Sequence, residues 1–175
     1  FIDYKNTGYF SKIAIDYIEQ KNDLKPFYLH EISEKGIEAS IEARIYFPQH
    51  NRDVLVEELQ QQYAETQTAS LVQQNILSLK NKNTFTVTTA HQPNIFGGPL
   101  YVVYKILHVV KLAQELSKKY SDKHFVPVYY MGSEDADLDE LNNITINGKK
   151  YTWHTTQTGA VGRMCVDKNL LSLIA

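Results

Sequence analysis

Residues 85–99 read FTVTTAHQPNIFGGP, and this stretch decides the fold class. Its first five residues are rich in β-branched side chains and predict a strand. The glycines and proline that close the stretch predict a tight turn. Leucine and valine side chains then recur at helical spacing from Leu100 to about Tyr120, which predicts a long helix with Pro99 at its first turn, where a missing N–H costs nothing. We expect the core-facing side of this helix to carry Val103, Ile106, Leu107, Val110, Ala113 and Leu116.

A second strand is predicted at Phe125–Met131, which reads FVPVYYM. Strand, helix and strand in close succession form a βαβ unit, so we expect parallel strands and a right-handed crossover. Ligands of such sheets bind beyond the carboxyl ends of the strands. The segments Ala90–Pro99 and Gly132–Glu140 each follow one of the strands and are dense in polar side chains. They should therefore meet at the ligand-binding edge of the sheet.

The regions on either side of this unit have a different character. Residues 1–82 carry apolar side chains at helical spacing, with Ser11 and Asn51 as candidate helix caps, and we expect a helical lead-in packed on the core. Residues 83–142 are the expected βαβ part of that core. Residues 143–175 alternate around Asn147-Gly148, which predicts a β-hairpin that begins a connecting insertion, followed by a flexible loop at Gly159–Met164.

The amino-acid composition indicates the class of protein and argues against some partners and sites. The chain has 175 residues, 43% apolar and 22% charged, with a net charge of −2, which indicates a globular domain and argues against nucleic acid as a partner. Cys165 is the single cysteine, so an internal disulfide and a multi-cysteine metal site are excluded. The apolar runs are too short to span a bilayer, and the start lacks the layout of a signal peptide, so we expect a cytoplasmic protein without membrane partners. Since the chain opens at Phe1 and stops within a helical pattern, we expect an N-terminal piece of a longer enzyme.

The loop after the first strand offers candidate binding residues. Gly97 and Gly98 let the backbone approach a ligand closely, and the helix that follows directs backbone N–H groups and its dipole at an anion. Their spacing fits neither the Walker pattern nor the dinucleotide fingerprint, so a tight structural turn is an equally good interpretation. His91 can donate to a phosphate or a transferring acyl group, or be an ordinary hydrogen-bonded loop residue. Gln92 suits substrate positioning, and Lys105 can line the cleft or point into solvent.

The loop after the second strand carries five carboxylates in seven residues, from Glu134 to Glu140. Ser133 or Asp135 can cap a short helix, which explains part of this acidity. The remaining carboxylates can bind an amine, orient a sugar hydroxyl, hold magnesium through water or act as a base. Asp135 and Asp137 are the leading candidates. No His/Cys cluster supports zinc, and no Gly-x-Ser-x-Gly turn supports a serine hydrolase.

Taken together, these segments resemble the bacillithiol-biosynthesis cysteine-adding enzymes. The residues that carry the resemblance are Ala90–Tyr101, Lys105, Phe125–Met131, Ser133–Asp137 and Gly159–Arg163. The resemblance implies an α/β fold with a Rossmann-like parallel-sheet core, related to class I aminoacyl-tRNA synthetases, preceded by the helical lead-in and followed by the hairpin insertion from about residue 143. In its full-length form it implies a C-terminal coiled coil and a homodimer.

The activity implied by this resemblance is that of a ligase adding L-cysteine to the amino group of glucosaminyl malate, with this piece inactive by itself. The implied catalytic residues are Asp135, Asp137 and His91, and the implied substrate- or nucleotide-binding residues are Gln92, Asn94, Gly97, Gly98, Pro99, Lys105 and Glu134. Ala136 stands where the family often has His, which puts a proton-transfer role at that position in doubt. ATP or ADP is the expected nucleotide, together with cysteine and the amino-sugar malate, and no metal is expected.

Two other functions remain open at this stage. One is a different ATP-dependent ligase or nucleotidyltransferase on the same fold, because a fold does not fix a substrate. The other is a nucleotide-binding or scaffold module without catalysis, whose two loops would tolerate alanine substitution. The gathering of His, Gln, Lys and acidic residues at one sheet edge favours an enzyme.

Overall fold

The computed structural model of the protein describes residues 2–174, which form two compact units. The first unit ends at Glu58 and the second begins at Leu59. The expected division between a lead-in and a core near residue 82 stays a prediction. Within the described residues, no helix is long and apolar enough to cross a membrane.

The first unit is helical. Its elements are a 3₁₀ turn η1 at Tyr4–Asn6, helix α1 at Lys12–Ile18, a 3₁₀ turn η2 at Asn22–Phe27, helix α2 at Glu34–Glu42 and the first part of helix α3 at Gln49–Gln62. The predicted cap at Ser11 is confirmed, since its hydroxyl oxygen accepts a hydrogen bond from the N–H of Ala14 at 3.4 Å. The predicted cap at Asn51 is wrong. Because α3 begins two residues earlier, Asn51 lies inside its first turn, where a side chain does not cap the helix start.

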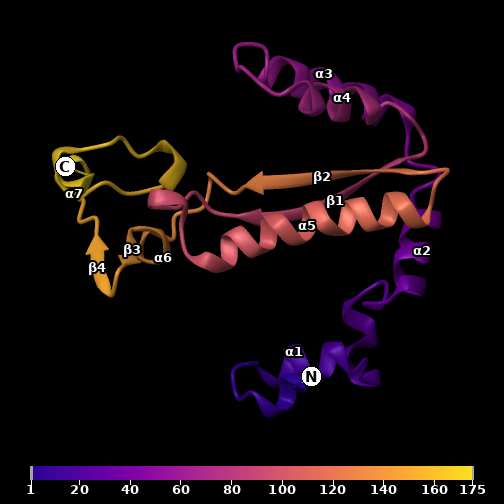
Figure 1. Cartoon of the computed structure of the whole chain (residues 1–175), viewed down its shortest axis with the longest axis horizontal. Coiled ribbons are helices and arrows are strands. Elements are labelled where there is room, and N and C mark those ends of the chain that lie inside the picture. The colour runs from indigo at the N-terminus through magenta and orange to yellow at the C-terminus, as the bar shows by residue number, and fades with distance from the viewer. Residues whose placement is uncertain (1, 175) are drawn as a thin grey trace. The chain divides into compact units, whose positions relative to one another are not determined.

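The second unit contains the βαβ unit that the sequence predicts. Its elements in chain order are α4 at Ser70–Ser78, β1 at Thr84–His91, a 3₁₀ turn η3 at Ile95–Gly97, α5 at Leu100–Lys119 and β2 at His124–Met131. Strands β1 and β2 pair in parallel, with Thr84 opposite His124 and His91 opposite Met131. Figure 1 shows the two strands side by side, with α5 running along them and contacting both. The parallel α/β arrangement is therefore confirmed.

The core of this unit lies between α5 and the two strands. On the sheet, Phe85 and Phe125 are buried, and their ring centroids are 5.9 Å apart. The buried residues of α5 are Val102, Val109, Ala113 and Leu116. The expected core face was partly wrong, since Val103 and Leu107 are 45% and 57% exposed. Helix α5 is apolar on more than one side, so hydrophobic spacing alone does not determine which side meets the sheet.

A hairpin and two short helices follow β2. Helix α6 spans Leu138–Leu141, and strands β3 at Asn143–Ile146 and β4 at Lys149–Thr152 pair antiparallel. The two turn residues, Asn147 and Gly148, have φ angles of 51° and 79°, as a type I′ turn requires, so the predicted hairpin is confirmed. Beyond it, a 3₁₀ turn η4 at Val161–Arg163 and helix α7 at Lys168–Ile174 complete the described chain.

Candidate functional site

The two polar loops start from the same edge of the sheet. Because His91 ends β1 directly opposite Met131 at the end of β2, the chain leaves both strands side by side. The backbone N–H of Gly132 donates to the carbonyl oxygen of His91 at 3.0 Å, and the Tyr129 hydroxyl approaches the same oxygen at 3.4 Å. The expectation that both polar segments begin at the carboxyl edge is therefore confirmed.

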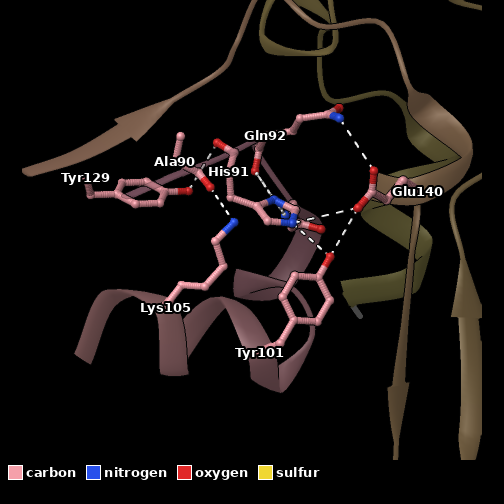
Figure 2. Close-up of polar contacts among 8 residues, drawn as sticks. Ala90, His91, Gln92, Tyr101, Lys105, Tyr129 and Glu140 are labelled. Atoms are coloured by element: carbon pink, nitrogen blue, oxygen red, sulfur yellow. Dashed lines mark hydrogen bonds and ion pairs between the residues drawn. The ribbon is translucent and has the colours of Figure 1, made fainter. Parts of the chain in front are cut away.

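His91 is the centre of a polar cluster at this edge. Its side chain is only 7% exposed. The Nδ1 atom lies 2.9 Å from Nδ2 of Asn94, and the Nε2 atom lies 2.8 Å from the hydroxyl oxygen of Tyr101. Figure 2 shows the imidazole ring between the end of β1 and the first turn of α5, with both ring nitrogens directed at protein groups. A substrate atom can reach either nitrogen only after one of these contacts opens.

The two ring nitrogens of His91 have different neighbours. Nδ1 lies 2.9 Å from the amide nitrogen of Asn94 and 3.0 Å from the carbonyl oxygen of Gln92, to which the Asn94 amide also donates at 3.0 Å. On the other side, a Tyr101 hydroxyl that donates to a carboxylate accepts from an Nε2–H of His91. The hydroxyl hydrogen of Tyr101 is left to point away from the ring.

That hydrogen meets Glu140, the last carboxylate of the acidic segment. The Tyr101 hydroxyl donates to Oε1 of Glu140 at 3.1 Å, and the same carboxylate oxygen lies 3.8 Å from Nε2 of His91. Burial of the Tyr101 hydroxyl raises its pKa above the usual value. The hydrogen bond to Glu140 and the negative charge of that carboxylate raise this pKa further. The Tyr101 hydroxyl is therefore held as a protonated donor, while the Glu140 side chain is 45% exposed and open to a ligand.

Two amide oxygens of the first loop lack a hydrogen-bond donor. The side-chain nitrogen of Gln92 points at Oε2 of Glu140 at 3.5 Å, and that of Asn94 points at His91, so both amide orientations are fixed by acceptors. Their oxygens, Oε1 of Gln92 and Oδ1 of Asn94, are buried and have no partner. A buried acceptor without a donor costs about 1–3 kcal/mol. The loop therefore has two unused acceptors beside the polar cluster.

The start of α5 fits an anionic group. No side chain caps the helix at Pro99, so the first backbone N–H groups of this 20-residue helix lack a side-chain acceptor. Gly97 has a φ of 83° and open space where a side chain would be, as expected of a turn that admits a ligand. Lys105, expected to bind substrate or nucleotide, instead donates to the carbonyl oxygen of Ala90 at 2.5 Å. To meet a phosphate, its ammonium group must leave that carbonyl.

The carboxylates of the acidic segment are exposed, and the first two of them contact nearby groups. Glu134 accepts a hydrogen bond from the hydroxyl of Tyr130 at 2.7 Å, which is the main reason that the pKa of Glu134 lies below its usual value. Oδ1 of Asp135 accepts from the neighbouring N–H of Ala136 at 2.7 Å. The predicted helix caps, Ser133 and Asp135, are wrong. Helix α6 begins at Leu138, so Asp137 occupies the cap position, and its side chain makes no capping hydrogen bond.

A second segment, Gly159–Met164, holds the acidic loop through backbone hydrogen bonds. The N–H of Val161 donates to the carbonyl oxygen of Asp135 at 2.8 Å, and the N–H of Gly162 donates to that of Ser133 at 3.0 Å. The Gly159–Met164 loop, expected to be flexible, thus contains a 3₁₀ turn bonded to the backbone of the acidic loop. The shape of the acidic loop therefore depends on residues about 27 positions further along the chain.

The structure thus joins some of the predicted site residues and leaves others apart. His91, Gln92 and Asn94 form one cluster, and Gln92 reaches across to the acidic segment. Within residues 2–174, the side chains of Glu134, Asp135 and Asp137 make no hydrogen bond or ion pair to that cluster. Among these residues no group of three or more His, Cys, Asp or Glu side chains is placed to hold a metal ion.

Two members of the cluster, Tyr101 and Glu140, were not among the site residues predicted from the sequence. Tyr101 lies ten residues beyond His91, in the first turn of α5, and Glu140 lies 39 residues beyond Tyr101. The only sequence signal for them is their position, one at a helix start and one at the end of an acidic run. Neither position predicts which of several similar side chains makes the contact.

Known proteins resemble this chain over most of its length. Residues 1–175 match the family model described as "Bacillithiol biosynthesis BshC, N-terminal Rossmann-like domain". The chain is 47% identical over 162 residues to a protein of Cytophaga hutchinsonii, covering 93% of the chain and 31% of that relative. It is 43% identical over 167 residues to a protein of Flavobacterium johnsoniae, covering 95% of the chain and 32% of that relative. Both relatives carry the name "Putative cysteine ligase BshC", and the chain spans about a third of their length.

Proposed function

The chain belongs to the BshC family of bacillithiol biosynthesis, as its N-terminal Rossmann-like domain, and on that premise we propose that it forms part of a ligase joining L-cysteine to the amino group of glucosaminyl malate. The relatives are named as cysteine ligases, and the substrate pair is carried over from the resemblance of the two sheet-edge loops. The full-length protein is proposed to be a homodimer in the cytoplasm.

One observation supports this proposal above the others. The two polar segments, Ala90–Pro99 and Gly132–Glu140, leave the same sheet edge, and a Glu140 contact joins them. Amide formation requires one group that binds the amine, one that binds a carboxylate or phosphate, and one that accepts a proton. The first loop offers an uncapped helix start for the anionic group, and the acidic segment offers carboxylates for the amine.

The proposed reaction forms one C–N bond. The amine nitrogen of glucosaminyl malate attacks the carboxyl carbon of cysteine, the C–O bond to the activating group breaks, and that group leaves with the bonding electron pair. The nitrogen loses a proton to a carboxylate of the enzyme. Asp135 and Asp137 are the proposed carboxylates that attract and orient the amine. Both are exposed, and within the described residues the one hydrogen-bond partner of their side chains is the N–H of Ala136.

ATP is the proposed source of the activating group, since a free carboxylate does not react with an amine at a useful rate. When bound, the nucleotide supplies a phosphorus-containing leaving group on the cysteine carboxyl. Gly97, Gly98 and Pro99 would hold its phosphates at the start of α5, with Lys105 moving from the Ala90 carbonyl to join them. Gln92, Asn94 and Glu134 are proposed to contact the nucleotide or the substrates.

The experiment that tests this function uses the full-length protein. It is incubated with L-cysteine and glucosaminyl malate, with and without ATP, and the products are read by mass spectrometry. The expected result is the condensed thiol, formed only when ATP is present. Formation of the thiol without ATP would remove the nucleotide from the proposal. If no thiol forms while ATP still raises the melting temperature, the fold and the site stand and the substrate assignment fails. If ATP has no effect on the melting temperature either, the nucleotide site fails as well.

A further inference from the structure

We infer that Glu140 is the carboxylate that accepts the proton of the substrate amine, and that Tyr101 and His91 are positioning residues that hold it in place. This inference rests on the proposed function and names one residue for its proton-transfer step. Glu140 was not among the residues expected to be catalytic. It is singled out by its contacts rather than by its place in the acidic run.

The contacts of Glu140 differ from those of the other carboxylates in that run. Its Oε1 accepts from the Tyr101 hydroxyl at 3.1 Å, and its Oε2 receives a long contact from the amide of Gln92 at 3.5 Å. Figure 2 shows Tyr101 and Gln92 approaching the carboxylate from two sides. Within the described residues, Glu140 is the one carboxylate of residues 134–140 whose side chain contacts His91 and the loop after β1. It therefore lies where the amine-binding and anion-binding loops meet.

The position suits a general base. A base needs a defined orientation and an accessible lone pair, and general acid–base catalysis contributes roughly 10²–10⁴-fold in rate. The donors from Tyr101 and Gln92 orient the carboxylate. Because the Glu140 side chain is 45% exposed, lone pairs not used by these donors remain open to the substrate. Tyr101 itself is 46% exposed, whereas the His91 side chain is 7% exposed.

The direction of the hydrogen bonds explains why His91 holds Tyr101 in position and does not transfer a proton. Tyr101 donates to Glu140, so the Tyr101 oxygen accepts from Nε2 of His91, while Nδ1 of His91 lies 2.9 Å from the Asn94 amide nitrogen and 3.0 Å from the Gln92 carbonyl oxygen. A proton arriving at Glu140 cannot pass along this chain to His91, because Nε2 already carries a hydrogen. The catalytic role expected of His91 thus takes a specific form, in which the imidazole fixes the Tyr101 hydroxyl and, through it, the carboxylate.

The step transfers one proton from the substrate amine to Glu140. The neutral amine attacks the activated acyl carbon, and its nitrogen becomes positively charged in the tetrahedral adduct. Glu140 takes one proton from that nitrogen and becomes a neutral acid. The C–O bond to the phosphorus-containing group then breaks, and this group leaves with the electron pair. Glu140 returns its proton to solvent, which restores the carboxylate for the next turnover.

The test measures kcat and KM for glucosaminyl malate in full-length variants. Glu140→Gln is expected to lower kcat by about 100-fold or more while KM stays within about twofold, because the amide keeps the shape but accepts no proton. Asp139→Asn is the matched control, since it removes one charge from the neighbouring position of α6 and the Asp139 side chain makes no hydrogen bond or ion pair within residues 2–174. The control is expected to keep wild-type kcat. Melting temperatures establish that each variant is folded.

A double variant tests whether Tyr101 acts through Glu140 or independently of it. Tyr101→Phe alone is expected to lower kcat about tenfold, whereas Tyr101→Phe combined with Glu140→Gln should be no slower than Glu140→Gln, since residues that act as a unit are not additive. Wild-type kcat in Glu140→Gln, a rise in KM alone, or fully additive losses would each overturn the inference and leave the ligase function intact. If the wild-type protein forms no condensed thiol, the proposed function fails and the inference falls with it.

Discussion

Gly162 and Ser133 lie so close that no side chain fits between them. A Cβ atom on Gly162 would be 2.4 Å from the Cβ of Ser133 and 2.7 Å from its carbonyl oxygen. The same two residues share a backbone hydrogen bond of 3.0 Å, and the next one, from Val161 to Asp135, is 2.8 Å long. The close approach therefore keeps the acidic loop in register with the segment that supports it.

Substitution of Gly162 by Ala is expected to separate the two segments. The new methyl group meets backbone as well as a side chain, so relief requires a main-chain shift, which costs about 1–3 kcal/mol. Urea denaturation followed by circular dichroism measures the loss. Gly132→Ala is the control, because a Cβ there meets nothing within 4 Å, and it should change stability by no more than about 0.5 kcal/mol. Equal effects of the two substitutions would contradict the importance of this contact.

The two glycines before α5 should respond differently to alanine. Gly97 and Gly98 both have positive φ, at 83° and 77°, so each substitution carries a backbone cost of about 1–2 kcal/mol. A Cβ on Gly97 meets nothing, whereas one on Gly98 would lie 2.8 Å from Cβ and Cγ of Asn94. We expect Gly98→Ala to destabilise the protein by about 1 kcal/mol more than Gly97→Ala, since overpacking adds to the backbone cost. Comparison of the two urea midpoints measures the difference, and a larger loss in Gly97→Ala would refute it.

Removal of both leading carboxylates of the acidic loop should abolish turnover. Asp135→Asn combined with Asp137→Asn keeps the size of both side chains and removes two negative charges from the proposed amine site. Production of the condensed thiol by the full-length variant, read by mass spectrometry, should fall by about 10²-fold or more, because both carboxylates are proposed to orient the amine. Asp139→Asn again serves as the control. Normal rates in the double variant would remove Asp135 and Asp137 from the mechanism.

The acid stability of the C-terminal part should depend on Asp167. The backbone N–H of Leu170 is the largest cause that holds the pKa of Asp167 below its ordinary value of 3.8, and the indole N–H of Trp153 adds to it. Because the folded-state pKa is the lower one, the stabilisation is present above pH 3.8 and is lost as the pH falls through the folded-state value. Asp167→Asn should therefore reduce the loss of stability below pH 4.

Fluorescence provides the measurement for this prediction. Trp153 is the single tryptophan of the chain and is 4% exposed, so its emission reports unfolding next to Asp167. Urea titrations of this chain at a series of pH values, with and without Asp167→Asn, give the two stability curves. Parallel curves below pH 4 would show that Asp167 does not contribute to the acid dependence.

Local patterns were sufficient to predict the βαβ unit, the Asn147-Gly148 hairpin and the sheet edge where the polar loops meet. Each depends on signals within a few residues, such as β-branched runs, helical spacing or a turn pair, and on the rule that parallel strands end at a common edge. The Ser11 cap was predicted for the same reason, since the hydroxyl group and the N–H that it binds are three residues apart.

These local patterns do not predict contacts between residues that are distant in the sequence. The hydrogen bond of Tyr101 to Glu140 joins residues that are 39 positions apart. The loop has five acidic side chains, and the sequence does not indicate which of them accepts this hydrogen bond. The buried side of α5 was misjudged at Val103 and Leu107, because an apolar helix offers more than one face to a sheet. The start of α6 was also misjudged, since Asp135 and Asp137 are equally good cap residues in sequence and the backbone decides between them.

The parallel pairing of β1 and β2 also governs how this unit folds. Every residue of β1 pairs with one about 40 positions further along, so no local turn brings the strands together. The entropy of closing that loop must be lost before the first ladder bond forms, whereas α5, which lies within the loop, needs only local contacts. Helix formation takes about a microsecond, so α5 can form before the strands pair and shorten the distance that they must close. Substitutions that weaken α5 should therefore slow the folding of this unit as well as destabilise it.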